Sequence, residues 1–367
     1  MLCLTTKTVF AKLANALAQF AKHLSGVVGV LEKTRNTPSH RRAPDELGRE
    51  KILHSNNALQ DKKSVLVGIP VYNDEKTITC CLENVLNQTQ RACHIQNVLI
   101  VASGCTDRTT ELVKIKRNLD GRILLFEEGE RYGKASALNR IFEFFRAHNY
   151  DYLIVTNGDA VLRGDAVDRL VEHAERTQSK LVCGKPEPIT APHTPLDAVY
   201  EFIWGLHNEF LRLGYGFKKP HCTDELMCFS HNVYWSIPVD TINDGAYFSI
   251  LLAGRGEKSD HCAKAIVGVS VPLSILGLIK QRSRIILGHI LLKKKLHTTS
   301  DTFESVMFRK PQIAVGILVH QLLKHGITCF IKAGAIECIS LGVALLRSTS
   351  NNRAWVWERV EHAGASV

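Results

Sequence analysis

The stretch SVLVGIP, residues 64–70, is a short apolar run that stops at a proline, and it opens a pattern that repeats along the chain. Similar runs recur at residues 97–102, 122–126 and 152–156, and a segment with helical periodicity separates each run from the next. Short apolar strands that alternate with helices are typical of a parallel sheet covered by helices on both faces. Because such sheets bind ligands beyond the carboxyl ends of their strands, we expect the functional residues there.

The same periodicities extend the prediction over the rest of the chain. Helices are expected at residues 75–88, 106–117, 134–148, 165–176, 196–213 and 274–296, and further strands at residues 180–183, 225–230 and 265–271. Upstream, apolar residues at spacings of three and four predict an amphipathic helix over residues 8–31, followed by a polar linker. We therefore divide the chain into an N-terminal helix and linker (1–62), an α/β domain (63–295) and a helical C-terminal region (296–367).

The distribution of charge argues against a nucleic-acid-binding protein. Of the net charge of +10, residues 1–63 carry +6 and residues 280–295 carry another +6, whereas residues 64–279 carry −4. A nucleic-acid binder more often has its basic residues across the face of its core. Basic flanks that also hold apolar residues suit an anionic membrane surface, and a solvated basic face is the plainer alternative.

The cysteines and the apolar segments bear on the location of the protein. The eleven cysteines include no CxxC pair, so neither a zinc site nor a disulfide framework follows, and we expect a reducing, cytoplasmic compartment. No signal peptide is predicted, because Lys12, Lys22 and His23 interrupt the apolar residues near the N-terminus. Residues 311–346 are the best candidate for a membrane-associated segment, although lysines and histidines interrupt them. We expect peripheral attachment to the cytoplasmic face of a membrane, and insertion of the C-terminal segment stays open.

Polar residues follow the first two predicted strands. After residue 70 the sequence reads VYND, and either Asn73 or Asp74 can cap the next helix. The second strand is followed by SGCTD, residues 103–107, in which Gly104 permits a tight turn and the N–H groups of the next helix face the strand ends. Each segment by itself is explained equally well by an ordinary turn between a strand and a helix.

The next two segments are candidates for phosphate and metal binding. In GKASALN, residues 133–139, Lys134 stands at a helix start, where free N–H groups and an ammonium suit a phosphate. In NGDAV, residues 157–161, Asp159 directly follows a buried strand and can hold Mg²⁺ or Mn²⁺ together with substrate phosphates. Asn157 can point the same way and donate a hydrogen bond to a ribose or a phosphate. The plainer alternative for Lys134 is an exposed residue in a helix cap.

Two later segments complete the set. Asp244 opens a predicted helix, where it is either an N-cap or a general base toward an acceptor hydroxyl. In KQRSR, residues 280–284, Gln281 and Arg284 are neighbours on one helix face, and clustered guanidinium groups suit a pyrophosphate leaving group. The alternative is a basic helix face on lipid headgroups, which the three lysines at residues 293–295 also favour.

Taken in order, the segments IPVYNDE, VASGCTD, GKASALN, NGDAV, ND and QRSRI resemble the signatures of the family-two glycosyltransferases with a GT-A fold. The resemblance covers residues 64–295 and implies a Rossmann-like α/β domain with a mixed, mainly parallel sheet and helices on both faces. It also implies an inverting transfer from a nucleotide sugar with Mg²⁺ or Mn²⁺, in which Asp244 is the catalytic base and Asp159 the metal ligand. The residues implied in binding the nucleotide sugar are Pro70, Val71, Tyr72, Asp74, Ser103, Lys134, Asn139, Asn157, Asp159, Gln281, Arg282 and Arg284.

The chain departs from the family pattern in three places. Ala102 and Ser103 stand where a pair of aspartates is usual, one of which reads the nucleobase, so the identity of the base stays open. Asn157 replaces the first aspartate of the metal-binding DxD element, which removes one negative charge from that site. Ile285 replaces the tryptophan that stacks on an acceptor sugar in polymerising members. We therefore expect a single transfer to a lipid-linked or glycan acceptor at a membrane surface.

Two other function classes compete with glycosyl transfer. A nucleotidyltransferase would carry a Gly-rich, arginine-bearing signature near its first strand, where this chain has IPVYND. A catalytically inactive relative that binds a nucleotide sugar or a membrane is consistent with the missing aspartate pair and with Asn157. The presence of both Asp159 and Asp244 favours the enzyme, of the hexosyl- or N-acetylhexosaminyltransferase class.

Overall fold

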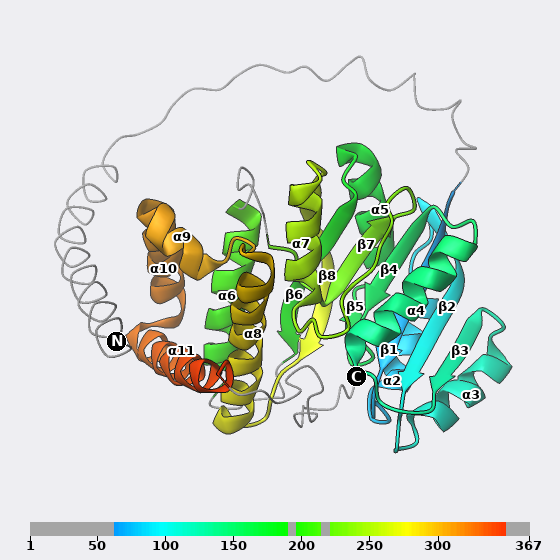
Figure 1. The fold of residues 1–367 in the computed structure, drawn as a ribbon, viewed down its shortest axis with the longest axis horizontal. Helices are drawn as coiled ribbons and strands as arrows, with labels where there is room; N and C mark the ends of the chain where they lie inside the picture. Colours follow the sequence, from blue (N-terminus) through cyan, green and yellow to red (C-terminus); the bar gives the residue numbers. More distant parts are fainter. Residues whose placement is uncertain (1–61, 190–195, 214–220, 350–367) are drawn as a thin grey trace, which may run out of the picture. The chain divides into compact units, whose positions relative to one another are not determined.

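The described part of the chain is an eight-stranded sheet packed between helices (Figure 1). A computed structural model describes residues 62–189, 196–213 and 221–349, so the predicted helix over residues 8–31 and its linker lie outside the described residues. The strands are β1 Lys63–Val71, β2 Cys93–Ser103, β3 Ile123–Glu128, β4 Tyr152–Thr156, β5 Val161–Leu162, β6 Leu181–Ile189, β7 Leu226–Ser230 and β8 Ser259–Ser270. The helices are α2 Ile78–Leu86, α3 Thr109–Leu119, α4 Lys134–Ala147, α5 Ala166–Thr177, α6 Asp197–Leu213, α7 Asp244–Gly254, α8 Ile275–Leu296, α9 Phe303–Arg309, α10 Pro311–His325 and α11 Ile327–Arg347.

The sheet is mixed, with the strand order β3-β2-β1-β4-β7-β6-β8-β5. The strands β1 to β4 run parallel to one another, as the alternation of strands and helices predicts. By contrast, β7 lies between β4 and β6 and is antiparallel to both, so the expectation of a mixed, mainly parallel sheet is confirmed. Because β7 runs backwards, its first residue, Leu226, pairs with Thr156 at the carboxyl end of β4. Residues just before β7 therefore lie at the edge of the sheet where the functional residues are expected.

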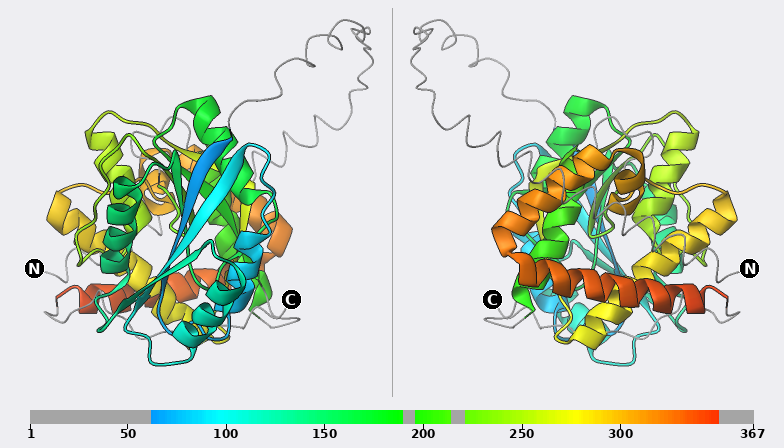
Figure 2. Two further views of the ribbon diagram at one scale, coloured as in Figure 1. Left: turned by 90° about the vertical axis from the view of Figure 1, so that its right-hand side faces the viewer. Right: turned by 90° about the vertical axis from the view of Figure 1, so that its left-hand side faces the viewer.

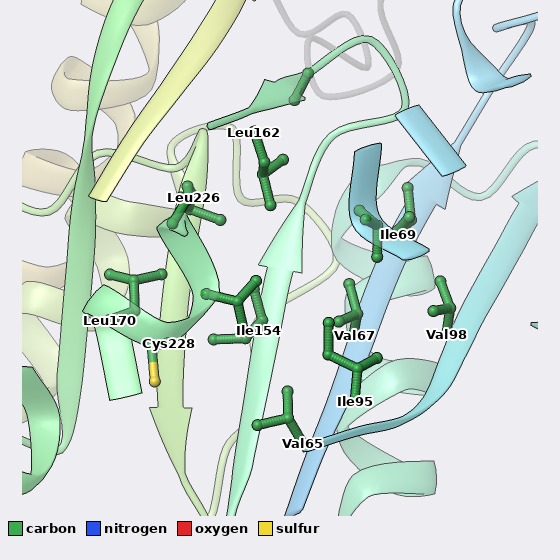
Figure 3. Packing of buried hydrophobic residues seen from close by; sticks show 14 of the residues in the cluster. Val65, Val67, Ile69, Ile95, Val98, Ile154, Leu162, Leu170, Leu226 and Cys228 are labelled. Atoms are coloured by element: carbon green, nitrogen blue, oxygen red, sulfur yellow. The ribbon is translucent and has the colours of Figure 1, made fainter. Parts of the chain in front are cut away.

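Side chains of the central strand β1 alternate between two separate cores. Val65, Val67 and Ile69 are fully buried in the core that includes residues of α2, α3 and α5 (Figure 3). Leu66 points to the opposite face and packs with residues of α4 and α7. Successive residues of a strand point to opposite faces, so the apolar run 64–70 is explained by a strand that is covered on both sides.

A third layer consists of α6, α8 and α11, which pack together beside the sheet (Figures 1 and 2). Val199 and Phe202 of α6 are buried in the same apolar cluster as Leu278 of α8 and Ile336 of α11. The apolar segment 311–346 is two helices and not one, because Gly326 has φ +82° and separates α10 from α11. Glycine adopts this left-handed conformation at little cost, so the chain turns there.

Within the described residues, the predicted helices and strands are present, and their ends differ from the prediction by a few residues. The expectation that Asn73 or Asp74 caps the first helix was wrong, because α2 begins at Ile78 after Thr77. The backbone N–H groups of Thr77 and Ile78 both donate to the Asp74 carbonyl, so a turn lies between the strand and the helix. The two-residue strand β5 was not predicted, since a run of that length has no readable periodicity.

Candidate active site

The loops that follow β1 and β2 are joined by hydrogen bonds. The Thr106 backbone N–H donates to Asn73 Oδ1 at 2.8 Å, and Asn73 Nδ2 donates to Thr106 Oγ1 at 3.0 Å. Asn73 has φ +54°, a left-handed conformation that asparagine adopts more readily than most residues. The predicted nucleotide loop is therefore fixed against its neighbour before any ligand binds.

The predicted nucleotide-binding residues of this loop are placed in different ways. Pro70 and Val71 are buried in the sheet, so their side chains have no access to a ligand. The half-buried ring of Tyr72 lies under the guanidinium of Arg131, whose Cζ is 3.6 Å from the ring centroid. Asp74 Oδ2 accepts the backbone N–H of Tyr72 at 3.1 Å. Ser103 Oγ likewise accepts a backbone N–H, that of Tyr132, at 3.2 Å.

The centre of the site is an ion cluster of one lysine and two aspartates. Lys134 Nζ lies 3.0 Å from Asp244 Oδ2 and 3.3 Å from Asp224 Oδ2. The Asp244 side chain is 3% exposed, whereas that of Asp224 is 40% exposed. Gly245 makes this arrangement feasible, because a Cβ at that position would overlap the Cys222 carbonyl oxygen. The start of α7 can therefore pack directly on the loop that precedes β7.

Burial and neighbouring charges shift the pKa values of Asp244 and Asp224 in opposite directions. Burial raises the pKa of Asp244 to about 7, and the charge of Asp224 adds to this effect while the Lys134 ammonium opposes it. Burial alone would raise the pKa of Asp224 as well, but the charge of Lys134 and the hydrogen bonds from Asp244 and Lys134 outweigh it and lower that pKa. Of the two carboxyl groups, Asp244 therefore binds a proton more readily than Asp224. A carboxyl group with a pKa near 7 is well suited to act as a general base at neutral pH.

Asn157 and Asp159 lie beside this cluster, in the turn after β4. Asn157 Nδ2 donates to Glu225 Oε2 at 2.7 Å, and Thr156 Oγ1 donates to the Glu225 carbonyl at 3.0 Å. Burial raises the pKa of Glu225 to about 8, and the charges of Asp224 and Asp159 add to the shift. The turn after β4 and the residues before β7 therefore form one acidic region.

The acidic region can bind a divalent ion only if substrate phosphates and water supply most of the ligands. Within residues 62–189, 196–213 and 221–349, no group of three or more His, Cys, Asp or Glu side chains is placed to hold a metal ion. Mg²⁺ and Mn²⁺ in nucleotide sites take one or two carboxylates from the protein and complete their shell with phosphates and water. The half-buried carboxylate of Asp159 fits that mode.

Helix α8 brings Arg284 to the cluster. Asn243 Nδ2 donates to the Ile285 carbonyl at 2.8 Å, which ties α8 to the start of α7. Asn243 is also the N-cap residue of α7, so the alternative that Asp244 serves as the N-cap was wrong. Burial lowers the pKa of Arg284, and the charges of Asp224 and Asp244 oppose that effect, which places its guanidinium near both carboxylates.

Two predicted binding residues are engaged elsewhere. Both polar atoms of the Asn139 side chain bind the main chain of Ile237, at 2.8 and 2.9 Å. Arg282 donates to Glu337 of α11 at 2.6 Å, on a different face of α8 from Arg284. Gln281 is half-buried on α8, one turn before Arg284. The structure thus brings together Lys134, Asn157, Asp159, Asp244 and Arg284.

Sequence reasoning missed the acidic pair Asp224 and Glu225. The available signal was two consecutive acids directly before the apolar strand LMCFS. A row of three histidines was missed as well: His207, His221 and His289 have successive ring centroids 5.6 and 5.5 Å apart. Burial lowers the pKa of His221 to about 4 and that of His289 to about 3, so these rings are neutral at physiological pH. Their wide separation in the sequence left no signal.

Comparison with known proteins relates part of the chain to one family. Residues 66–237 match the protein-family model described as Glycosyl transferase family 2. This segment, a little under half of the chain, is thus of the family-2 glycosyltransferase type. The matched segment includes Lys134, Asp159 and Glu225 and ends before Asp244 and α8.

Several curated glycosyltransferases are similar to a part of the chain. The glycosyltransferase GlyG of Streptococcus pneumoniae serotype 4 is 22% identical over 120 residues, which are 33% of this chain and 38% of that protein. An undecaprenyl-phosphate 4-deoxy-4-formamido-L-arabinose transferase of Photorhabdus laumondii is 28% identical over 115 residues, which are 31% of this chain and 34% of that protein. The chain thus matches only about a third of the length of these relatives.

The fold also resembles a solved glycosyltransferase structure. A mannosyltransferase of Pyrobaculum calidifontis, in complex with GDP-Man and Mn²⁺, superposes with a TM-score of 0.53 and 17% sequence identity. The match covers 91% of this chain and 97% of the mannosyltransferase chain. This likeness confirms the expected GT-A fold, with its curled, mainly parallel sheet between helices.

Proposed function

We propose that this protein transfers one sugar from a nucleoside-diphosphate sugar to a hydroxyl group of a lipid-linked or other membrane-surface acceptor, with inversion at the anomeric carbon. The observation that carries the proposal is the buried Asp244, which pairs with Lys134 at 3.0 Å. Lys134 and Asp159 both belong to the segment that matches the family-2 glycosyltransferases. A base and a candidate metal ligand are thus found together where parallel sheets bind their ligands.

The proposed reaction is a single displacement. The acceptor oxygen attacks the anomeric carbon as the bond from that carbon to the diphosphate breaks, and the electron pair leaves with the phosphate oxygen. Asp244 takes the proton of the acceptor hydroxyl, and Lys134 holds the Asp244 carboxylate in position. Arg284 binds the leaving diphosphate through its guanidinium group. A Mg²⁺ or Mn²⁺ ion held through Asp159 would neutralise the charge that develops on the diphosphate.

A membrane-surface acceptor is supported by a relative and by α11. The Photorhabdus relative is named as an undecaprenyl-phosphate transferase, a lipid-linked chemistry. By length and composition α11 could cross a membrane, with a mean hydropathy of 1.8, but one of its faces packs in the cluster with α6 and α8 and Glu337 pairs with Arg282. We infer that α11 lies in the headgroup layer and presents its exposed apolar face to lipid. That face consists of Ile327, Ile331, Ile339, Leu341, Leu345 and Leu346.

The cysteines support a cytoplasmic location for the reaction. All ten cysteines among the described residues are free thiols, and seven of these are buried. Free thiols persist in a reducing compartment, so we place the protein on the cytoplasmic face of the membrane.

Two leucines of equal exposure allow the proposed contact of α11 with lipid to be tested by binding to vesicles. Leu346 on α11 and Leu119 on α3 are both 77% exposed. Leu346→Glu is expected to weaken binding of the full chain to vesicles of three parts phosphatidylcholine and one part phosphatidylglycerol by roughly tenfold, the effect of withdrawing one leucine from lipid. Leu119→Glu serves as the matched control and should bind as the unchanged protein does. Sedimentation with vesicles measures both, and equal binding by all three proteins would remove α11 from the proposed attachment.

The release of nucleoside diphosphate tests the proposed function. The full chain is incubated with a panel of UDP-, GDP- and TDP-sugars, a crude membrane-lipid extract, and Mg²⁺, Mn²⁺ or EDTA. We expect release from one class of donor that EDTA abolishes, which would identify both the sugar and the base. If folded protein releases nothing from any donor, with or without the extract, the inactive binding module becomes the better description.

A further inference from the structure

The turn after β4 has one carboxylate, whereas the DxD element of the family pattern has two. Position 157 is an asparagine, so only Asp159 of this turn offers a charged oxygen. A single carboxylate is a weak anchor for a hard divalent cation, whose affinity rises with the number of charged oxygen ligands. Tight binding of the ion at this turn therefore needs a second carboxylate from a neighbouring residue.

Glu225 occupies the matching place on the adjacent strand. It directly precedes β7, and the pairing of Leu226 with Thr156 sets it opposite the end of β4. Its Oε2 accepts the amide N–H of Asn157 at 2.7 Å. The Glu225 carboxylate therefore contacts the side chain of residue 157, which itself has no carboxylate. Its Oε1 is not part of that hydrogen bond. The Asn157 contact thus orients the carboxylate and leaves one oxygen for a ligand.

Asp74 is another acidic residue against this turn, and its carboxylate already has contacts within the protein. A Cβ added at Gly158 would lie 2.7 Å from Asp74 Oδ2, so the Asp74 carboxylate packs on the turn itself. Its Oδ2 accepts the Tyr72 N–H, and only 9% of the residue is exposed. Asp244 and Asp224 are paired with Lys134. Among the described acids beside the turn, Glu225 is the one whose contacts leave it suited to a cation.

We propose that Glu225 supplies to the divalent ion the carboxylate that Asn157 cannot, so that Asp159 and Glu225 hold the ion from the facing ends of two antiparallel strands. The proposal rests on the metal-dependent transfer proposed above and deepens it. Asp159 and Glu225 would hold the Mg²⁺ or Mn²⁺ ion, and oxygens of the diphosphate and of water would supply its remaining ligands. Glu225, 68 positions after Asn157 in the chain, thus provides the negative charge that an aspartate at residue 157 would carry.

The test measures binding of Mn²⁺ alone to the full chain, by the electron paramagnetic resonance signal of the free ion. Glu225→Gln keeps an oxygen that can accept from Asn157 but has no charge, and it is expected to weaken Mn²⁺ binding by about tenfold or more. The exchanged variant Asn157→Asp/Glu225→Gln returns the carboxylate to the neighbouring position and is expected to restore binding to within about threefold of the unchanged protein. Circular dichroism melting of each variant shows that it is folded.

Two further variants separate the possible outcomes. Glu143→Gln, in an exposed pair with Arg140 on α4, is the control and should leave Mn²⁺ binding unchanged. If Asp159→Asn weakens Mn²⁺ binding but Glu225→Gln does not, Glu225 is no ligand, and the proposed function stands without it. If the unchanged protein shows no saturable Mn²⁺ site while it still releases nucleoside diphosphate, the ion assignment of both residues is overturned. Failure of the exchanged variant to recover binding would make Glu225 a structural partner of Asn157 only.

Discussion

Asp244→Asn is expected to lower the rate of sugar transfer by about a thousandfold, the range lost when a positioned general base is removed. Asparagine has nearly the same size and keeps an oxygen toward Lys134, so the fold should be preserved. It cannot accept the proton of the acceptor hydroxyl. The measurement is steady-state release of nucleoside diphosphate in the presence of acceptor. Asp240→Asn is the matched control, because Asp240 is four residues away and forms an exposed pair with Lys295.

The pH dependence of the unchanged enzyme follows from the same residue. Because the pKa of Asp244 is raised to about 7, the group is protonated and inactive as a base below that pH, and activity should rise as the pH passes through about 7. The charge of Asp224 contributes to this raised pKa, so Asp224→Asn should move the rise in activity to lower pH. Normal turnover by Asp244→Asn, or a rate that does not change between pH 5.5 and 8, would exclude Asp244 as the base.

Asp159→Asn is expected to reduce metal-dependent turnover by about a hundredfold or more, since charge neutralisation by the ion contributes several kcal/mol to the barrier. The loss should be partly overcome by raising the Mn²⁺ concentration, because the substitution weakens binding of the ion and leaves Asp244 in place. Asp165→Asn is the control: Asp165 lies six residues later and pairs with Arg169 at the surface. An Asp159→Asn enzyme with unchanged turnover and unchanged sensitivity to EDTA would rule out this aspartate as the ligand.

The local part of the site could be predicted from the sequence. Each strand from β1 to β4 is an apolar run that ends in polar residues, and parallel strands bring such ends to one edge. Lys134 and Asp159 were placed at that edge by this reasoning, and the structure has them there. Asp244 was recognised only by its order among the other motifs, because the residues around it are an ordinary helix start.

The contacts between distant segments could not be predicted in the same way. Arg282 and Arg284 are two residues apart on α8, yet Arg282 pairs with Glu337 of α11, whereas the charges of Asp224 and Asp244 act on the pKa of Arg284. Asn139 matches a family motif, but its amide holds the main chain of Ile237. Which face of a helix meets which neighbour depends on how α6, α8 and α11 pack, and periodicity does not report that.

The sequence by itself determined that this chain has an α/β sheet with its polar residues at the carboxyl ends of parallel strands, since apolar runs and turn residues are local signals. The tertiary structure alone decided that β7 runs antiparallel to β4 and so carries Asp224 and Glu225 to the same edge. The sequence LMCFS is equally apolar read in either direction, so no local pattern encodes the orientation of that strand. Its direction is set by pairing with β4 and β6, and that pairing completes the acidic half of the site.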